Sequence, residues 1–597
     1  MRFFLLPLLT FIFINSCSGS VLKERATPAS VAWGGCLNQP QTAYECANVD
    51  VPLDWQDASK GTVPIYVSRY PATKLPRKGY MFYNPGGPGL SGSRFIQSQG
   101  KLLQAQLGLD WDVISWDPRG VLLSGPTIQM FNNNNNEDDD FWGQLQGLGN
   151  YNTHGNLTVA EDAQFFMSQA SKFDNMTIAF NNATIQKNGD NLKYVGTCAV
   201  VRDLVYLVDS IYGEGSDVNF WGISYGTVIG VYLTQMFPER VGKVILDGVY
   251  DAEKQANLAP MKWLDQDYKG VESALIKWTE ACAAGTGPTC GFASETGIST
   301  SDGILSKIKQ MLDTAHRTYD GTSVTASSIN DDIRHWPYEY ILQIIRTQLY
   351  DQSSWSWLDR LFLKLLKSQS GTSSSFKDIE LDSRFFKRGP ATYGFFPEIY
   401  EYNYVNFAVY CGDTIDPQGE TTQDLFTLTV QAAQSVSPNF ASLTPAYSPR
   451  SFCHNWKARA VERLPQPMTK KPKNVVLVIG NVADPLTPYE NAQRLASSAF
   501  LGAQARLVKF NTGGHSSFSG ESDCINDVVR NYTSGNPPKD AGNEEEDVVC
   551  TLKKTAFGRP PLSWGGQVED SASEASRTLV GMSLLISTVI GMSILMF

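Results

Sequence analysis

The chain has 597 residues, more than the roughly 100–200 of a typical domain, so one large domain with an insertion, or two domains, is expected. Hydrophobic residues make up 42% and charged residues 18%, a balance typical of folded globular proteins, which excludes global disorder. The formal net charge of -11 opposes a phosphate backbone and no basic stripe interrupts it, which excludes nucleic acid as a partner.

The first residues predict export. Arg2 precedes a short apolar run that ends near Ile14 and is followed by small residues up to Ser20. This order is typical of a secretory signal peptide over residues 1–20, and the run is too short to span a bilayer. The alternative, a buried N-terminal helix, is disfavoured because the run has no polar face.

Sequons and cysteines also fit an oxidising compartment. N-x-[ST] sequons predict glycosylation at Asn156, Asn175, Asn182 and Asn531. Of ten cysteines, Cys17 leaves with the signal peptide and nine remain. We pair those that lie near one another in sequence, although spacing alone does not establish connectivity: Cys36 with Cys46, Cys282 with Cys290, Cys411 with Cys453, and Cys524 with Cys550. Cys198 is then the odd thiol, expected to be buried and inert.

From residue 63 onwards, apolar strand-like runs alternate with helical patterns. This alternation predicts βα units and a mostly parallel sheet, so the expected fold class is α/β. The expected strands are 63–70, 80–83, 112–116, 217–221, 243–246, 474–479 and 505–510. The expected helices include 200–211, 227–237 and 489–500.

Two stretches interrupt this alternation. Residues 131–194 open with asparagines and the acids Glu137 to Asp140, which predicts a solvated excursion; a calcium site is the alternative, but the EF-hand spacing is absent. Residues 251–472 are rich in Trp, Tyr and Leu at helical spacing, which predicts a large helical cap inserted into the core. The core then consists of residues 21–250 and 473–560.

The C-terminal segment 561–597 predicts attachment to a membrane surface. Apolar residues run from Thr578 to Phe597 with no basic cluster after them, and small residues near Ser571 lie upstream of a polar spacer. This layout is typical of a GPI-attachment signal. A plain transmembrane anchor and a core helix are the alternatives. We expect contact with a membrane only through this segment.

A serine motif carries the chemistry. Gly222-Ile223-Ser224-Tyr225-Gly226 follows an apolar run and precedes a helical pattern. G-x-S-x-G at a strand-to-helix turn is the nucleophile elbow of serine hydrolases. The motif therefore predicts Ser224 as the nucleophile.

A base and an acid must follow the serine along the chain. Of the five histidines, His515 alone follows a late strand, in a glycine-containing loop that can bring the imidazole over the sheet edge. The loop after the strand that precedes it contains one carboxylate, Asp484. We therefore predict His515 as the base and Asp484 as the acid that orients it; the alternative for Asp484 is a turn residue before Pro485.

Glycines after the strand 80–83 predict an oxyanion hole. Asn84-Pro85-Gly86-Gly87-Pro88-Gly89 places backbone amides where they can approach a ligand closely. We expect the N–H groups of Gly87 and Tyr225 to receive the oxyanion. The same glycines also match G-x-G-x-x-G of dinucleotide-binding folds, but Pro88 removes an amide and that interpretation leaves the serine, aspartate and histidine unexplained.

Several motifs of the sequence together resemble those of one family. The motifs are Asn84–Gly89, Trp116–Gly120, Gly222–Thr227, Leu246–Val249, Asp484 and Gly514–His515. The sequence is similar, over residues 63–550 without the polar excursion, to the tripeptidyl aminopeptidase-like branch of the proline iminopeptidase family, whose members have the α/β-hydrolase fold. The resemblance implies a serine exopeptidase that needs no metal and no organic cofactor, with Ser224, Asp484 and His515 as its triad. Pro85, where proline iminopeptidases carry His, favours the tripeptidyl branch.

The sequence thus predicts a secreted, surface-anchored serine hydrolase whose substrates are peptides with free N-termini. Glu339, Glu398 and Glu401 are candidates for binding the substrate ammonium. An esterase or lactonase acting on small apolar esters is the alternative within hydrolases. An inactive hydrolase fold that serves as a surface binding module is the alternative from another class.

Overall fold

The computed structural model describes residues 31–36, 43–128, 156–285, 290–318, 338–369, 397–417, 419–443, 448–464, 467–542 and 546–553. Three predicted features lie outside the described residues: the signal peptide, the acidic run from Glu137 to Asp140 and the C-terminal membrane-attachment segment. Within the described ranges, no helix combines the length and hydropathy that crossing a bilayer requires.

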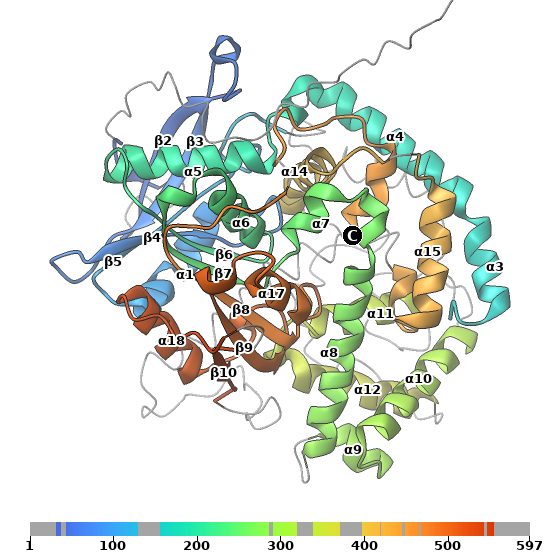
Figure 1. Ribbon diagram of the computed structural model, residues 1–597. Coiled ribbons are helices and arrows are strands. Elements are labelled where there is room, and N and C mark those ends of the chain that lie inside the picture. Colours follow the sequence, from blue (N-terminus) through green and yellow to red (C-terminus); the bar gives the residue numbers. More distant parts are fainter. Residues whose placement is uncertain are drawn as a thin grey trace, which may run out of the picture.

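One twisted sheet of ten strands organises the described part of the chain (Figure 1). Its strands are β1 (Gly34–Gly35), β2 (Glu45–Pro52), β3 (Thr62–Tyr70), β4 (Gly79–Asn84), β5 (Trp111–Trp116), β6 (Val218–Ile223), β7 (Val241–Asp247), β8 (Val476–Ala483), β9 (Ala505–Gly513) and β10 (Val548–Cys550). The spatial order is β1-β2-β3-β5-β4-β6-β7-β8-β9-β10. Every pairing from β5 to β10 is parallel, whereas β1, β2 and β3 pair antiparallel. The mostly parallel sheet is confirmed.

Both faces of the central strands are apolar, as parallel strands covered by helices require. On β6, Phe220 faces the cluster formed with α5 (Thr197–Tyr212) and α6 (Gly226–Met236). Its neighbour Trp221 faces the opposite cluster, formed with α1 (Gly92–Leu107) and α18 (Asp523–Thr533). α17 (Tyr489–Ala496) follows β8. The core is therefore a layer of strands between two layers of helices.

The expectation of an exposed excursion over residues 131–194 was wrong for its described part. Residues 160–188 form α3 (Ala160–Ser168) and α4 (Ala170–Asn188), which lie along α15 (Thr422–Ser435) at the outer side of the molecule (Figure 1). Phe166 on α3 and Phe173 and Phe180 on α4 recur every seven residues, and all three are buried. The many polar residues between them hid this periodicity.

The predicted glycosylation sites lie on or beside helices. Asn175 and Asn182 are exposed on α4, and Asn531 is exposed on α18. Asn156 is half-buried just before α3, and its side-chain oxygen accepts a hydrogen bond from the Thr158 amide. Glycosylation at these positions stays a prediction.

The segment between β7 and β8 is mainly helical in its described part. Its α-helices are α7 (Ala252–Asn257), α8 (Asp265–Ala284), α9 (Gly291–Thr296), α10 (Ser301–Thr318), α11 (Tyr338–Gln348), α12 (Trp355–Gln369), α14 (Pro397–Asp413) and α15. The 3-10 helix η11 (Pro449–Asn455) follows them. Helices α8 to α12 enclose a hydrophobic cluster of their own, as expected for an inserted unit large enough to bury a core.

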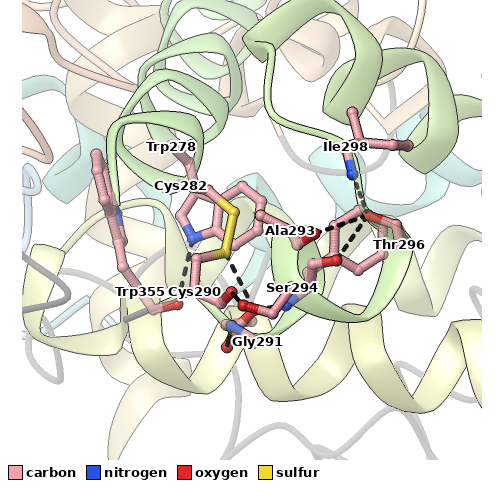
Figure 2. Close-up of a disulfide and its surroundings, with 11 residues drawn as sticks. Trp278, Cys282, Cys290, Gly291, Ala293, Ser294, Thr296, Ile298 and Trp355 are labelled. Atoms are coloured by element: carbon pink, nitrogen blue, oxygen red, sulfur yellow. Dashed lines mark hydrogen bonds between the residues drawn. A yellow bond between two sulfur atoms is a disulfide. The ribbon is translucent and has the colours of Figure 1, made fainter. Parts of the chain in front are cut away.

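A disulfide closes the outer end of this insertion. Figure 2 shows Cys282, near the end of α8, bonded to Cys290, which precedes α9. The indole of Trp278 packs beside it and donates from Nε1 to the backbone oxygen of Trp355 at 3.2 Å. The carboxylate of Asp359 accepts from the first two amides of α9 at 2.9 and 2.8 Å, which caps that helix.

All four expected cysteine pairs are confirmed as disulfides. The expectation that Cys198 is a free thiol was wrong, because its sulfur is disulfide-bonded. Disulfides persist in oxidising compartments, so their presence indicates an extracellular protein.

Candidate active site

Ser224 lies at a strained turn between β6 and α6. Its φ is 57°, a left-handed conformation that non-glycine residues rarely adopt, and its amide donates to the Asp247 carbonyl at 2.9 Å. A Cβ at Gly222 would lie 2.2 Å from the Gly226 carbonyl oxygen, and one at Gly226 would lie 2.6 Å from the Asn84 carbonyl oxygen. Only glycines fit these two positions, which explains the G-x-S-x-G spacing.

Asp484 and His515 meet at the same edge of the sheet. Asp484 directly follows β8 and His515 lies two residues after β9, just as Ser224 directly follows β6. The carboxyl ends of these parallel strands lie at one edge, where α/β folds place their sites. His515 Nδ1 is 2.9 Å from both carboxylate oxygens of Asp484. Its Nε2 is buried and has no hydrogen-bond partner among the described residues, so this nitrogen is free to take a proton.

Backbone amides fix the Asp484 carboxylate. One oxygen accepts from the amides of Leu486 at 2.9 Å and Thr487 at 2.8 Å, and the other accepts from Ser516 at 3.0 Å. The Thr487 hydroxyl lies 3.3 Å from His515 Nδ1. Both side chains of the Asp484–His515 pair are essentially inaccessible to solvent. Because water is excluded, this network helps to set the orientation of the imidazole.

A second carboxylate holds the histidine loop. Asp247, at the end of β7, accepts from the Ser517 amide at 2.8 Å and from the Ser517 hydroxyl at 2.5 Å. Burial raises the pKa of Asp247 to about 6, although the bonds from Ser517 and the nearby His515 oppose that rise. Asp247 thus connects the loop of His515 to the end of β7, where the Asp247 carbonyl also accepts a hydrogen bond from the Ser224 amide.

The insertion holds the same loop from the other side. The His515 amide donates to the Tyr350 carbonyl at 2.8 Å, and the two rings meet edge to face with centroids 5.8 Å apart. On α8, a Cβ at Gly270 would lie 2.7 Å from the carbonyl oxygen of Asp484. The inserted helices therefore pack directly on the loops that carry Asp484 and His515.

The glycine loop after β4 packs on the serine turn. A Cβ at Gly86 would lie 2.8 Å from Ser224 Cβ and 3.1 Å from the Tyr225 amide nitrogen. The amides of Gly87 and Tyr225 make no hydrogen bond within the described chain. Both are therefore available to an anionic ligand, as an oxyanion hole requires.

The motif Trp116–Gly120 begins at the end of β5, the strand that pairs with β4. The Asp117 carboxylate accepts from the Ser91 hydroxyl at 2.7 Å and the Ser93 amide at 3.0 Å, at the start of α1. Arg119 forms a fully buried ion pair with Asp203 and donates to three backbone carbonyls. These contacts fix the strand end that supports the glycine loop.

The other described histidines lie outside this constellation. His454 bonds the Thr422 hydroxyl at 2.7 Å, between η11 and α15, and His316 lies on α10 with Nε2 at 3.4 Å from Asp162. His154 and His335 are outside the described residues. The side chains of the three glutamates expected to bind a substrate ammonium also lie outside the described part.

Sequence reasoning missed three residues that contact Asp484, His515 or the loop of His515. Asp247 belongs to the motif Leu246–Val249 that carried the resemblance, and Thr487 stands in the loop predicted for the acid. Their presence in those segments was a usable signal. Tyr350 gives no local signal, because its contact with His515 joins residues far apart in the chain.

Two family models match the chain. One is described as alpha/beta hydrolase fold and matches residues 80–275, and the other is described as TAP-like protein and matches residues 439–550. The first match contains Ser224, and the second contains Asp484 and His515. Each model covers less than half of the chain, so the two matches show that these segments are similar to α/β hydrolases and to TAP-like proteins.

Curated relatives align with this chain over most of its length. The serine protease Hip1 of Mycobacterium tuberculosis is 24% identical over 535 residues, covering 86% of this chain and 90% of the relative. The tripeptidyl aminopeptidase of Streptomyces coelicolor is 24% identical over 552 residues, covering 90% and 88%. Carboxylesterase B of Mycobacterium tuberculosis is 24% identical over 513 residues, covering 84% and 87%.

Proposed function

We propose that this chain is a serine exopeptidase that removes single residues or short peptides from free N-termini through an acyl-enzyme on Ser224. The observation that carries the proposal is the His515 imidazole, held by the Asp484 carboxylate at 2.9 Å while its other nitrogen is buried and unbonded in the described chain. A base in this state takes a proton from a nearby hydroxyl.

Acylation begins when the Ser224 oxygen attacks the carbonyl carbon of the scissile peptide bond. The hydroxyl proton passes to His515 Nε2, and the amides of Gly87 and Tyr225 receive the negative charge that develops on the carbonyl oxygen. Asp484 stabilises the imidazolium. His515 then gives the proton to the leaving nitrogen, the C–N bond breaks, and the N-terminal fragment remains as an ester on Ser224.

Deacylation repeats these steps with water. His515 takes a proton from the water, whose oxygen attacks the ester carbonyl, and the same two amides receive the oxyanion. The proton then returns to the Ser224 oxygen as the C–O bond breaks. The products are the released fragment with a free carboxylate and the restored enzyme, so no metal or cofactor takes part.

The substrate class rests on the relatives and on the insertion. Relatives that align over most of the chain bear the names serine protease and tripeptidyl aminopeptidase. The inserted helices contact the loops of Asp484 and His515 directly, and an enclosed site suits short chain ends better than internal peptide bonds. Both points favour an exopeptidase.

We also propose that the enzyme works outside the cell, at a membrane surface. Four disulfides support an oxidising compartment. The N-terminal apolar run, the sequons and the apolar C-terminal segment support export, glycosylation and attachment through a GPI-type tail. Release of surface enzyme by a phosphatidylinositol-specific phospholipase tests the attachment; enzyme that stays with the membrane after treatment contradicts it.

Hydrolysis of matched anilides tests the activity. We expect tripeptidyl and aminoacyl p-nitroanilides with a free N-terminus to be hydrolysed, the N-acetylated versions to be hydrolysed at least about tenfold more slowly, and Ser224→Ala to abolish turnover. Labelling by a fluorophosphonate should likewise require Ser224. Undiminished labelling of Ser224→Ala would refute the nucleophile assignment, and equal rates for free and acetylated substrates would refute the exopeptidase.

Ester hydrolysis is the second candidate, favoured by the similarity to carboxylesterase B. The same triad and oxyanion hole act on esters, because both reactions pass through a tetrahedral intermediate. If short acyl esters are turned over while every anilide is refused, the chain is an esterase. If wild-type protein neither labels nor turns over either class, it is an inactive binding module.

A further inference from the structure

Three residues on one helix of the insertion reach both halves of the oxyanion hole. Asn406, Tyr410 and Asp413 are spaced by four and three residues on α14, so they share one helix face. All three side chains are buried. α14 belongs to the insertion, whereas Gly87 and Tyr225 belong to the core, so these contacts cross between the two parts.

Two of the residues hold the glycine loop. Asn406 Nδ2 donates to the Pro88 carbonyl at 2.9 Å, and the Tyr410 hydroxyl donates to the Gly87 carbonyl at 3.3 Å. The Asn406 side-chain oxygen has no partner in the described chain, so the bond to Pro88 is the contact that this amide group makes. Because Gly87 has a φ of +103° and no side chain of its own, outside contacts must fix the direction of its peptide groups.

The third residue, Asp413, is connected to Tyr225, which forms the other half of the oxyanion hole. The Asp413 carboxylate accepts from the Thr197 amide at 3.1 and 3.2 Å and from the Thr197 hydroxyl. That hydroxyl lies 2.5 Å from the Tyr225 phenol oxygen, and the rings of Tyr225 and Tyr410 meet edge to face with centroids 6.4 Å apart. Tyr225, which supplies the second amide, is thereby connected to the same helix face.

The end of α14 is itself fixed. Cys411, beside Tyr410, is disulfide-bonded to Cys453 on η11, and the Gly412 carbonyl accepts from the Ala460 amide at 3.1 Å. The Arg450 guanidinium lies 3.6 Å above the Trp263 ring and 5.3 Å from the Tyr410 ring. Because these contacts hold the end of α14 in place, α14 restricts the movement of both loops that it contacts.

We propose that α14 positions the oxyanion hole, with Asn406 and Tyr410 aligning the amide of Gly87 and Asp413 aligning that of Tyr225. This inference rests on the proposed function. None of the three side chains needs to touch substrate, so they are positioning residues. Their loss misaligns amide donors that act on the transition state and leaves ground-state binding nearly intact.

The test uses Asn406→Leu and Tyr410→Phe in the full-length enzyme, with a tripeptidyl p-nitroanilide as substrate. Removing an oxyanion donor costs about 100-fold to 1,000-fold in kcat, so a misaligned donor is expected to cost about tenfold, with KM changed by less than about threefold. Ki for a tripeptide aldehyde, whose hemiacetal oxygen occupies the oxyanion hole, should rise by the same factor as kcat falls. A merely structural role would not produce this parallel.

Tyr232→Phe is the matched control, because that hydroxyl on α6 is buried and unbonded in the described chain. It should leave kcat, KM and Ki unchanged. The thermal unfolding midpoint of each variant is compared with that of wild type to check that the variant is folded. If Tyr410→Phe does not fold, Asn406→Leu alone tests the inference. If Ser224→Ala abolishes turnover but both α14 variants keep wild-type kcat and Ki, the α14 inference is overturned and the proposed function stands. If Ser224→Ala retains turnover, the proposed function itself fails.

Discussion

The buried carboxylate of Asp247 predicts a pH-dependent loss of stability that one substitution removes. Asp247→Asn keeps the shape of the side chain and an oxygen that accepts from the Ser517 amide, but it cannot ionise. A difference in pH dependence between wild type and variant therefore reports the charge of Asp247, together with its weaker interaction with His515.

The magnitude follows from the pKa. Burial raises the pKa of Asp247 from 3.8 to about 6, and each pKa unit corresponds to about 1.4 kcal/mol, so the effect is about 3 kcal/mol. Between pH 4 and pH 6 the native state binds more protons than the unfolded state. The free energy of unfolding of wild type therefore contains a term that falls as pH rises through this window and is fully lost above it.

Urea unfolding of both proteins at pH 4, 5, 6 and 7.5 measures the effect. We expect the free energy of unfolding of Asp247→Asn, relative to wild type, to increase by about 2–3 kcal/mol from pH 4 to pH 7.5. Asp217→Asn, at a half-exposed surface pair with Lys473, is the control and should change by less than about 1 kcal/mol. A constant offset between Asp247→Asn and wild type across the four pH values would refute the reasoning.

Three further substitutions test contacts around the site. Gly270→Ala should lower kcat at least about tenfold, because its Cβ would lie 2.7 Å from the carbonyl oxygen of Asp484. The higher helix propensity of alanine should at the same time contribute about 1 kcal/mol to the free energy of unfolding. Arg119→Leu should cost about 3–5 kcal/mol in urea unfolding, because it leaves Asp203 buried without its partner. Replacing both cysteines of the disulfide that begins at Cys282 with serine should cost about 2–3 kcal/mol but change kcat by less than about twofold, since about 18 Å of α8 separates that bond from Gly270.

Each of these predictions has its own control. Ser273→Ala, exposed on the same helix, should leave kcat unchanged; a normal kcat in Gly270→Ala would mean that the acid loop tolerates the displacement. Adding Asp203→Leu to Arg119→Leu should recover part of the lost stability, and no recovery would contradict the unpaired-charge argument. A large fall in kcat after removal of the disulfide would show that the outer end of the insertion acts on the site.

Local sequence patterns were sufficient for the central strands and for the constellation at their ends. The apolar run at 243–246 predicted β7 because a strand buried on both faces has no polar alternation, and the structure extends it to Val241–Asp247. The strand β2, next to the edge strand β1, was missed, since Glu45–Pro52 mixes acids and an asparagine into its more exposed face. The helix α1 was missed because glycines and glutamines interrupt its apolar pattern.

The supports of the site could not be predicted in the same way. The G-x-S-x-G motif is local, so it marks Ser224 directly. The contact between Asp247 and Ser517 joins residues 270 positions apart, and the bonds from α14 to the glycine loop span more than 300. Such pairs depend on how the insertion folds back on the core, which composition and periodicity do not encode.

The order of the strands has a consequence for synthesis. β8 pairs with β7 in the sheet, yet the 228 residues between Asp247 and Val476 must emerge before it can do so. At roughly 5–20 residues per second, the edge of β7 waits about 10–45 s for its neighbour. During that time an apolar parallel edge is open to other chains. The nascent protein is therefore aggregation-prone and inactive as a hydrolase until the last quarter of the chain has been synthesised. We expect that a chaperone in the compartment of synthesis is required for a high yield.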